Sequence, residues 1–128
     1  RISFPYSHSY RRKPDIARTV IERLKRGKEY FAVVDQKITP TSVREITKAL
    51  CLLLRCKTAG IYHIAGKYEQ GFTTPYTFAL KIAQSNNLDT SLIKPVAFAQ
   101  FAKSRIAPRP QHTWLDTSKI KALGMTKK

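Results

Sequence analysis

Helix-like and strand-like apolar patterns alternate along this chain, and the alternation limits the folds that it can adopt. Residues 14–27 carry apolar side chains at helical spacing, whereas residues 30–34 form a short run of aromatic and β-branched residues typical of a strand. The same two patterns recur further along. The other expected elements are strands at 1–4, 61–64 and 92–96, helices that begin at Ser42 and Thr74, and a short last helix that begins near Asp116 or Thr117. This alternation predicts an α/β protein.

Local signals support two of the helix starts. Ser42, followed three residues later by Glu45, fits a capping box, and Thr74 with Pro75 fits a capped start with proline in the first turn. Residues 99–113 show neither period, so we expect them to be irregular.

The length of 128 residues suits one domain with a modest core. The chain begins with Arg1 rather than Met, inside a strand-like segment, and we therefore expect a fragment or a processed product. No signal-peptide pattern is visible, and no apolar run approaches the ~20 residues of a membrane span. We expect a cytoplasmic protein without a membrane partner.

The net charge of +16, from 24 Lys and Arg against 8 Asp and Glu, makes nucleic acid a candidate partner. The densest basic stretches are residues 11–13 and 23–28, and the other basic residues are spread along the chain. Neither stretch alternates with aromatic residues, and no zinc-finger, helix-turn-helix or RNA-recognition signature is visible. A basic nucleic-acid-binding module stays open as an alternative function.

Three sequence patterns that carry chemistry are absent. The glycines cannot form G-x-G-x-x-G, the turn that binds a dinucleotide pyrophosphate in Rossmann folds. No tyrosine is followed by a lysine four positions later, and no serine lies in G-x-S-x-G. We therefore predict neither a catalytic residue nor a nicotinamide cofactor site within this chain.

The histidines and cysteines give no metal site or disulfide. His8, His63 and His112 are far apart and lack acidic or cysteine neighbours at metal-ligand spacing. Cys51 and Cys56 are five positions apart in a helical segment and do not share a helix face. We interpret both cysteines as free, partly buried thiols.

Three segments, in this order, carry a family resemblance. Residues 35–41 read DQKITPT before a capped helix, residues 60–66 read GIYHIAG, and residues 109–120 read RPQHTWLDTSKI. They resemble the DQ-x-G-x-P-T, G-x-Y-H-x-x-G and RP-x-x-x-x-L-D-x-x-K segments of dTDP-4-dehydrorhamnose reductases, which are extended short-chain dehydrogenases/reductases. Ile38 departs from the pattern, since the family commonly has glycine there.

The resemblance implies that residues 1–128 are a single substrate-binding domain, the C-terminal portion of such an α/β enzyme. An absent N-terminal Rossmann portion would carry NAD(P)H and the Ser/Thr, Tyr and Lys catalytic set. The intact parent would reduce the C4 ketone of dTDP-4-dehydro-L-rhamnose, whereas this fragment would be inactive and bind no cofactor. The regulatory β-subunit of methionine adenosyltransferase shares the scaffold, and a non-catalytic regulatory subunit is therefore the second hypothesis.

The resemblance also selects candidate substrate contacts. These are Phe4, Asp35, Gln36, Thr39, Arg105 and Arg109. Phe4 stands where the family usually has an aromatic residue, often Trp, that contacts the sugar nucleotide; otherwise it is a strand-end core residue. Arg109, and less strongly Arg105, suits a diphosphate, although Arg109 would alternatively pair with a carboxylate such as Asp116. Asp35, Gln36 and Thr39 would line the nucleotide side of the cleft or form a polar turn.

We expect three partners: the sugar-nucleotide substrate, the N-terminal half and a second copy of the chain. The basic cluster at residues 11–13 is expected to face an acidic N-terminal half or partner. Residues 1–4 and 60–65 are expected to be edge strands without their neighbours. Unpaired strand edges favour dimerisation or strand exchange.

Overall fold

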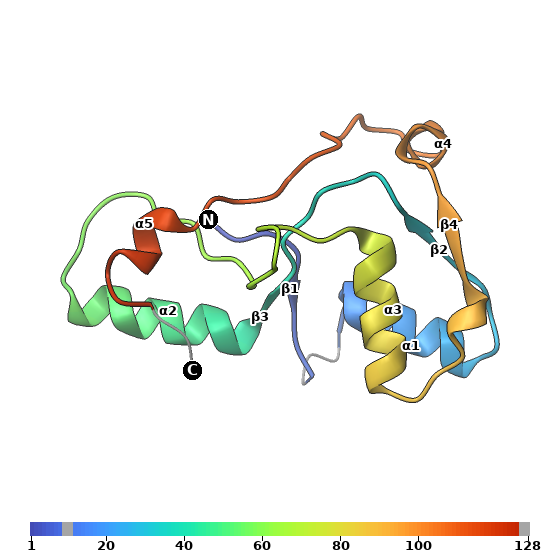
Figure 1. Cartoon of the computed structure of the whole chain (residues 1–128), viewed down its shortest axis with the longest axis horizontal. Helices are drawn as coiled ribbons and strands as arrows, with labels where there is room; N and C mark the ends of the chain where they lie inside the picture. Colours follow the sequence, from blue (N-terminus) through green and yellow to red (C-terminus); the bar gives the residue numbers. More distant parts are fainter. Residues whose placement is uncertain (9–11, 126–128) are drawn as a thin grey trace.

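The computed structural model describes residues 1–8 and 12–125, which form two packed groups of elements (Figure 1). The helices are α1 (Ile16–Lys25), α2 (Val43–Arg55), α3 (Pro75–Ser85), α4 (Phe98–Lys103) and α5 (Ser118–Lys121), with a 3-10 turn η1 at Thr90–Leu92. The strands are β1 (Pro5–Tyr6), β2 (Tyr30–Val33), β3 (Thr41–Ser42) and β4 (Ile93–Val96). The predicted α/β class is confirmed. No helix among the described residues is long and apolar enough to cross a bilayer.

The first group packs α1 and α3 against β2 and β4 (Figure 1). Its buried core, here called the first core, consists of Val20, Leu24, Ala32, Ala79, Ala83 and Ile93. The two strands are parallel, in register from Tyr30 opposite Ile93 to Val33 opposite Val96. Pro95 lies inside β4 although it has no N–H, which is tolerated because β4 pairs only with β2 among the described residues.

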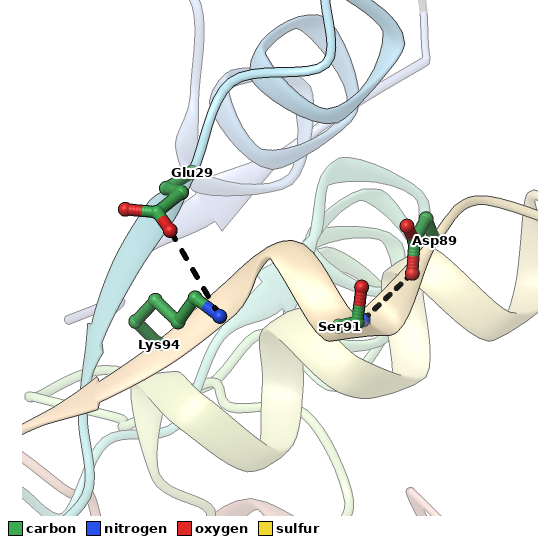
Figure 2. Close-up of polar contacts among 4 residues, drawn as sticks. All are labelled: Glu29, Asp89, Ser91 and Lys94. Atoms are coloured by element: carbon green, nitrogen blue, oxygen red, sulfur yellow. Dashed lines mark hydrogen bonds and ion pairs between the residues drawn. The ribbon is translucent and has the colours of Figure 1, made fainter.

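Two polar contacts lie at the start of this strand pair (Figure 2). The Lys94 Nζ lies 3.9 Å from the Glu29 carboxylate, and both side chains are about half exposed. The Asp89 carboxylate accepts the Ser91 N–H at 2.8 Å and caps η1. Hydrogen bonds from Ser91 hold the pKa of Asp89 below its usual value.

The second group surrounds a smaller second core of Ala49, Ile64 and Ile120, which brings together α2, the 61–64 segment and α5. The Lys119 Nζ donates to the Ile61 backbone oxygen at 3.0 Å and lies 4.4 Å from the centre of the Tyr62 ring. These contacts dock the C-terminal tail on the 61–64 segment.

Residues 36–41 cross between the two groups and are almost entirely buried. Ile38 and Thr73 form an antiparallel bridge, with each backbone N–H donating to the other residue's oxygen at 2.8 Å. Gly66 packs against this crossing segment so closely that a Cβ would lie 2.2 Å from the Pro40 oxygen. Residue 66 therefore has no room for a side chain.

The predicted helix caps are confirmed. The Ser42 Oγ accepts the Glu45 N–H at 3.2 Å, and the Glu45 carboxylate accepts the Ser42 N–H at 3.2 Å, completing the capping box of α2. The Thr74 Oγ1 accepts the Thr77 N–H at 3.1 Å at the start of α3.

The predicted strands at 1–4 and 61–64 are wrong. The two segments meet at one parallel bridge, between Ile2 and Ile64. Phe4 takes a left-handed backbone conformation with φ of 43°, which ends the extended run before the strand β1 begins. The strand β1 then pairs in parallel with β3, a pairing that the sequence did not indicate.

Two further predictions are corrected. The segment 99–113 is not wholly irregular, because α4 occupies its start, with Phe98, Phe101 and Ala102 at helical spacing. The cysteines are free as predicted, but both are exposed rather than partly buried. Cys51 lies on a face of α2 that the second core does not cover.

Candidate functional site

A cleft of about 1050 Å³ opens beside the first core, large enough for a nucleotide-sized ligand. Its walls come from residues 4–7, here called the β1 segment, and from the start of α1, β2, α4 and the stretch from Arg105 to Arg109. The Asp15 side chain supports this corner, because its carboxylate accepts both the Ser7 N–H and the Arg18 N–H at 2.9 Å. That bonding caps α1 and ties the β1 segment to it.

Aromatic rings form much of the cleft wall. The aromatic lining residues are Phe4, Tyr6, Tyr30, Phe31, Phe98 and Phe101. Phe31 is 58% exposed and Phe4 is 37% exposed, so their rings are available to a ligand. The left-handed backbone of Phe4 costs on the order of 1–3 kcal/mol and is held by the hydrogen bond from the Thr41 N–H to the Phe4 oxygen at 3.2 Å.

The charged residues of the cleft are mostly cations. Lys13, Arg105 and Arg109 line it, and Asp15 is the one acidic residue among its described lining residues. The Arg105 guanidinium carbon lies 4.6 Å from the centre of the Phe101 ring, a cation–π contact. Three cations against one carboxylate give the cleft a net positive charge for an anion, and the Asp15 carboxylate is already bonded to two backbone N–H groups.

The two tyrosines of the cleft are neutral donors. Burial, followed by the negative charges of Glu45 and Asp15, raises the pKa of Tyr6 above its usual value. Burial also raises the pKa of Tyr30. Neither phenol becomes a phenolate near neutral pH, so neither is suited to act there as a general base.

Four of the six predicted substrate contacts line this one cleft. They are Phe4, Gln36, Arg105 and Arg109. Thr39 does not line it, since its side chain is fully buried in the crossing segment. Asp35 does not line it either, because its carboxylate accepts the Phe98 N–H at 2.7 Å. The substrate role of the four lining residues stays a prediction.

Arg109 does not form the alternative ion pair with Asp116. The Asp116 carboxylate accepts the Ser118 N–H at 3.0 Å and the Ser118 hydroxyl at 2.8 Å. The one ion pair among the described residues joins Lys94 and Glu29. Arg109 is therefore exposed at the cleft without a carboxylate partner in the described part of the chain.

Sequence reasoning missed several residues of the cleft. Lys13 belongs to the basic cluster at 11–13, which was assigned to a domain junction; Lys13 and Arg12 are exposed, and Arg11 lies outside the described residues. Phe31 was predicted only as part of a strand, Phe101 fell in the segment 99–113 that was expected to be irregular, and Phe98 was assigned to no element. Strand alternation places Phe31 on the face opposite the buried Ala32, which was a usable signal.

The described residues hold no cluster of three or more His, Cys, Asp or Glu that would bind a metal ion. They also do not form a dinucleotide cradle. Gly27 follows the end of α1, and Gly124 follows α5, whereas a pyrophosphate-binding glycine turn opens a helix after a strand. These two glycine turns of the described residues therefore do not form the pyrophosphate-binding turn of a Rossmann fold.

A family model described as the RmlD substrate binding domain matches residues 1–128. This chain belongs to that family. The resemblance inferred from the three sequence segments is thereby confirmed. Among curated proteins, no sequence matches the chain.

Solved reductases share the fold of this RmlD-type domain. The dTDP-4-dehydrorhamnose reductase of Bacillus anthracis, solved in complex with NADP, superposes with a TM-score of 0.82 at 24% identity over 98% of this chain and 42% of that chain. A hypothetical dTDP-4-dehydrorhamnose reductase from Sulfolobus tokodaii gives 0.75 at 29% identity over 94% of this chain and 39% of that one. The Clostridium acetobutylicum reductase gives 0.79 at 24% identity over 94% and 40%. The domain thus spans about two fifths of the length of the reductases that it matches.

Proposed function

We propose that this domain binds a deoxy-sugar nucleotide in the aromatic, cationic cleft and serves as the substrate side of an NAD(P)H-dependent dTDP-4-dehydrorhamnose reductase. The observation that carries the proposal is the composition of the cleft. Exposed aromatic rings and three cations face one cavity, and the carboxylate beside them is already bonded. A nucleoside diphosphate sugar has planar and apolar surface together with two phosphates, and so it matches both features.

The cations, the aromatic rings and the amide of the cleft have different roles in binding. Arg105 and Arg109 supply charge-assisted hydrogen bonds to the diphosphate, and Lys13 adds a third positive charge. Phe4 and Phe31 offer ring faces to the sugar or the base. Gln36 is buried at the cleft and provides an amide that can both donate and accept hydrogen bonds.

The reduction itself belongs to groups outside this chain. We propose that a dinucleotide-binding portion of the reductase packs beside the domain and supplies NAD(P)H and the catalytic residues. An exposed apolar stripe on α2 supports this, since Leu50 and Leu54 are 50% and 78% exposed. The share of the matched reductases that the domain leaves uncovered is large enough for such a portion.

Calorimetric titration of the chain with thymidine diphosphate tests the binding part of the proposal. We expect binding that weakens as salt is added, and an Arg109→Ala variant that binds roughly tenfold less tightly, because it loses a charged hydrogen-bond donor. Arg55→Ala is the matched control, since Arg55 is exposed at the end of α2 and does not line the cleft. Equal affinities for the two variants, or no binding by the unchanged chain, would count against the proposal.

A further inference from the structure

One wall of the cleft is formed by a segment that makes few hydrogen bonds to the rest of the domain. We call Phe98–Gln111 the rim segment; it contains α4 and both cleft arginines. All residues from 102 to 110 are exposed. The hydrogen bonds of residues 99–110 in the described structure stay within residues 97–105, so the middle of the rim segment is not bonded to the rest of the domain.

Both ends of the rim segment meet at Asp35. The Asp35 Oδ1 accepts the Phe98 N–H at 2.7 Å. The Gln111 side-chain Nε2 donates to the Asp35 backbone oxygen at 2.8 Å and lies 3.5 Å from its Oδ2. Asp35, which follows β2, is therefore hydrogen-bonded to both ends of the rim segment. Phe98, the outgoing end, lies 63 positions further along the chain, and Gln111, the returning end, lies 76 positions further.

Two further hydrogen bonds hold the residues that follow the returning end. The Lys37 N–H donates to the His112 Nδ1 at 3.2 Å, and the Thr113 N–H donates to the Lys37 oxygen at 2.9 Å. The outgoing end follows β4 directly, where the Val34 N–H donates to the Val96 oxygen at 3.1 Å. Ala97 occupies the N-cap of α4, and its methyl group cannot cap the helix. Asp35 replaces that missing cap from another part of the chain, with a carboxylate acceptor in place of a local hydroxyl.

We infer that Asp35 is a positioning residue that ties the two ends of the rim segment and so fixes where Phe98, Phe101, Arg105 and Arg109 stand along the cleft. The sequence suggested a direct substrate contact for Asp35, but its carboxylate is bonded to protein and it does not line the cavity. A carboxylate facing a diphosphate would also repel it. The identity of the ligand rests on the proposed function, whereas the tie rests on the contacts of Asp35 alone.

Limited trypsin digestion of the full chain tests the tie without any ligand. The bonds after Lys103 and Arg105 lie in the exposed rim segment, whereas the bond after Arg109 precedes proline and resists trypsin. We expect Asp35→Ala to increase the rate of cleavage after Lys103 and Arg105 severalfold. Asp35→Asn keeps an oxygen that can accept the Phe98 N–H, and it should stay close to the unchanged chain. Glu29→Gln, an exposed carboxylate away from the rim, is the matched control.

Binding of thymidine diphosphate to the same variants completes the test. Asp35→Ala should weaken binding severalfold, and Asp35→Asn should restore it. The double variant of Asp35→Ala and Arg109→Ala should lose less binding free energy than the sum of the two single variants, because Arg109 is already displaced from the ligand in Asp35→Ala. If the unchanged chain binds no thymidine diphosphate while Asp35→Ala still exposes the rim, the proposed function fails and the tie stands. If binding depends on Arg109 but Asp35→Ala behaves like the unchanged chain in both assays, the tie is refuted. Equal loss in Asp35→Asn and Asp35→Ala would also refute it.

Discussion

The Tyr68 hydroxyl donates to the Pro40 backbone oxygen at 2.6 Å, across the segment that links the two cores. Pro40 is fully buried, so this oxygen has no access to water. The same oxygen is the atom that excludes a side chain at Gly66. A single carbonyl group thus couples the 66–68 loop to the crossing segment that leads from the cleft to α2.

Removing the Tyr68 hydroxyl should destabilise the domain. Tyr68→Phe leaves the Pro40 oxygen buried without a donor, at a cost of about 1–3 kcal/mol in the free energy of unfolding. Gly66→Ala should cost a similar ~1–3 kcal/mol, because its Cβ would overlap that oxygen. Urea denaturation measures both. Tyr76→Phe, in a tyrosine that packs against the first core, is the control, and an equal effect there would contradict the account.

Alkaline pH should weaken the fold, and Tyr68 should account for part of the loss. Burial, followed by the charges of Tyr6 and Glu45, raises the pKa of Tyr68 above its usual 10.0. Its stabilisation is therefore complete below pH 10.0 and is lost as the pH rises further, because the unfolded chain releases the proton first. Thermal unfolding followed from pH 8 to 11 should show a smaller drop for Tyr68→Phe than for the unchanged chain. An identical drop would rule out this contribution.

The bonds of Asp116 should be visible in its titration. Hydrogen bonds from Ser118 lower the pKa of Asp116 below its usual 3.8, with smaller effects from Lys121 and His63. The stabilisation is present above pH 3.8 and is lost as the pH falls through the lowered value. NMR titration of the side-chain carboxyl carbon should show the Asp116 pKa moving back toward 3.8 in Ser118→Ala. The shift should be partial, because the Ser118 backbone N–H remains in this variant, and a pKa that does not move would show that the Ser118 hydroxyl does not contribute.

The apolar stripe on α2 should make the isolated domain self-associate. Leu54 is 78% exposed and Leu50 is 50% exposed, and both lie on a face that no described residue of the second core covers. Light scattering after size exclusion should give a mass above 14.6 kDa that rises with concentration. Leu50→Lys with Leu54→Lys should restore the monomer. A monomeric unchanged chain would contradict this expectation and the earlier one of dimerisation.

Local features of the sequence were sufficient for α1, α2, α3 and α5 and for much of the cleft, but not for α4. The capping pair Ser42 and Glu45 and the Thr74–Pro75 start give helix positions because they depend on neighbouring residues alone. Arg109 was found because the motif that carries the resemblance begins with it, whereas Arg105 lies outside that motif and was a weaker candidate for the phosphate. Four of the six predicted contacts accordingly share one cavity.

The features that were missed depend on distant contacts. The bridge between Ile2 and Ile64 replaces two expected strands because no further described strand flanks either segment. The bond between Asp35 and the Phe98 N–H joins residues 63 positions apart, and nothing near Asp35 in the sequence indicates that its partner is a helix start. Long-range pairing of this kind follows from the tertiary fold and not from local pattern.

The most direct test of the central claim is an NMR titration of the isotopically labelled chain with thymidine diphosphate. If the cleft binds the nucleotide, the amide signals of Phe4, Gln36, Arg105 and Arg109 shift together and saturate with one affinity. Signals of the basic residues on the outer faces of α1 and α2, such as Lys25 and Lys48, stay in place. Shifts spread over those outer faces, or no shift at the cleft, would contradict the claim and would favour non-specific binding of anions by the +16 charge.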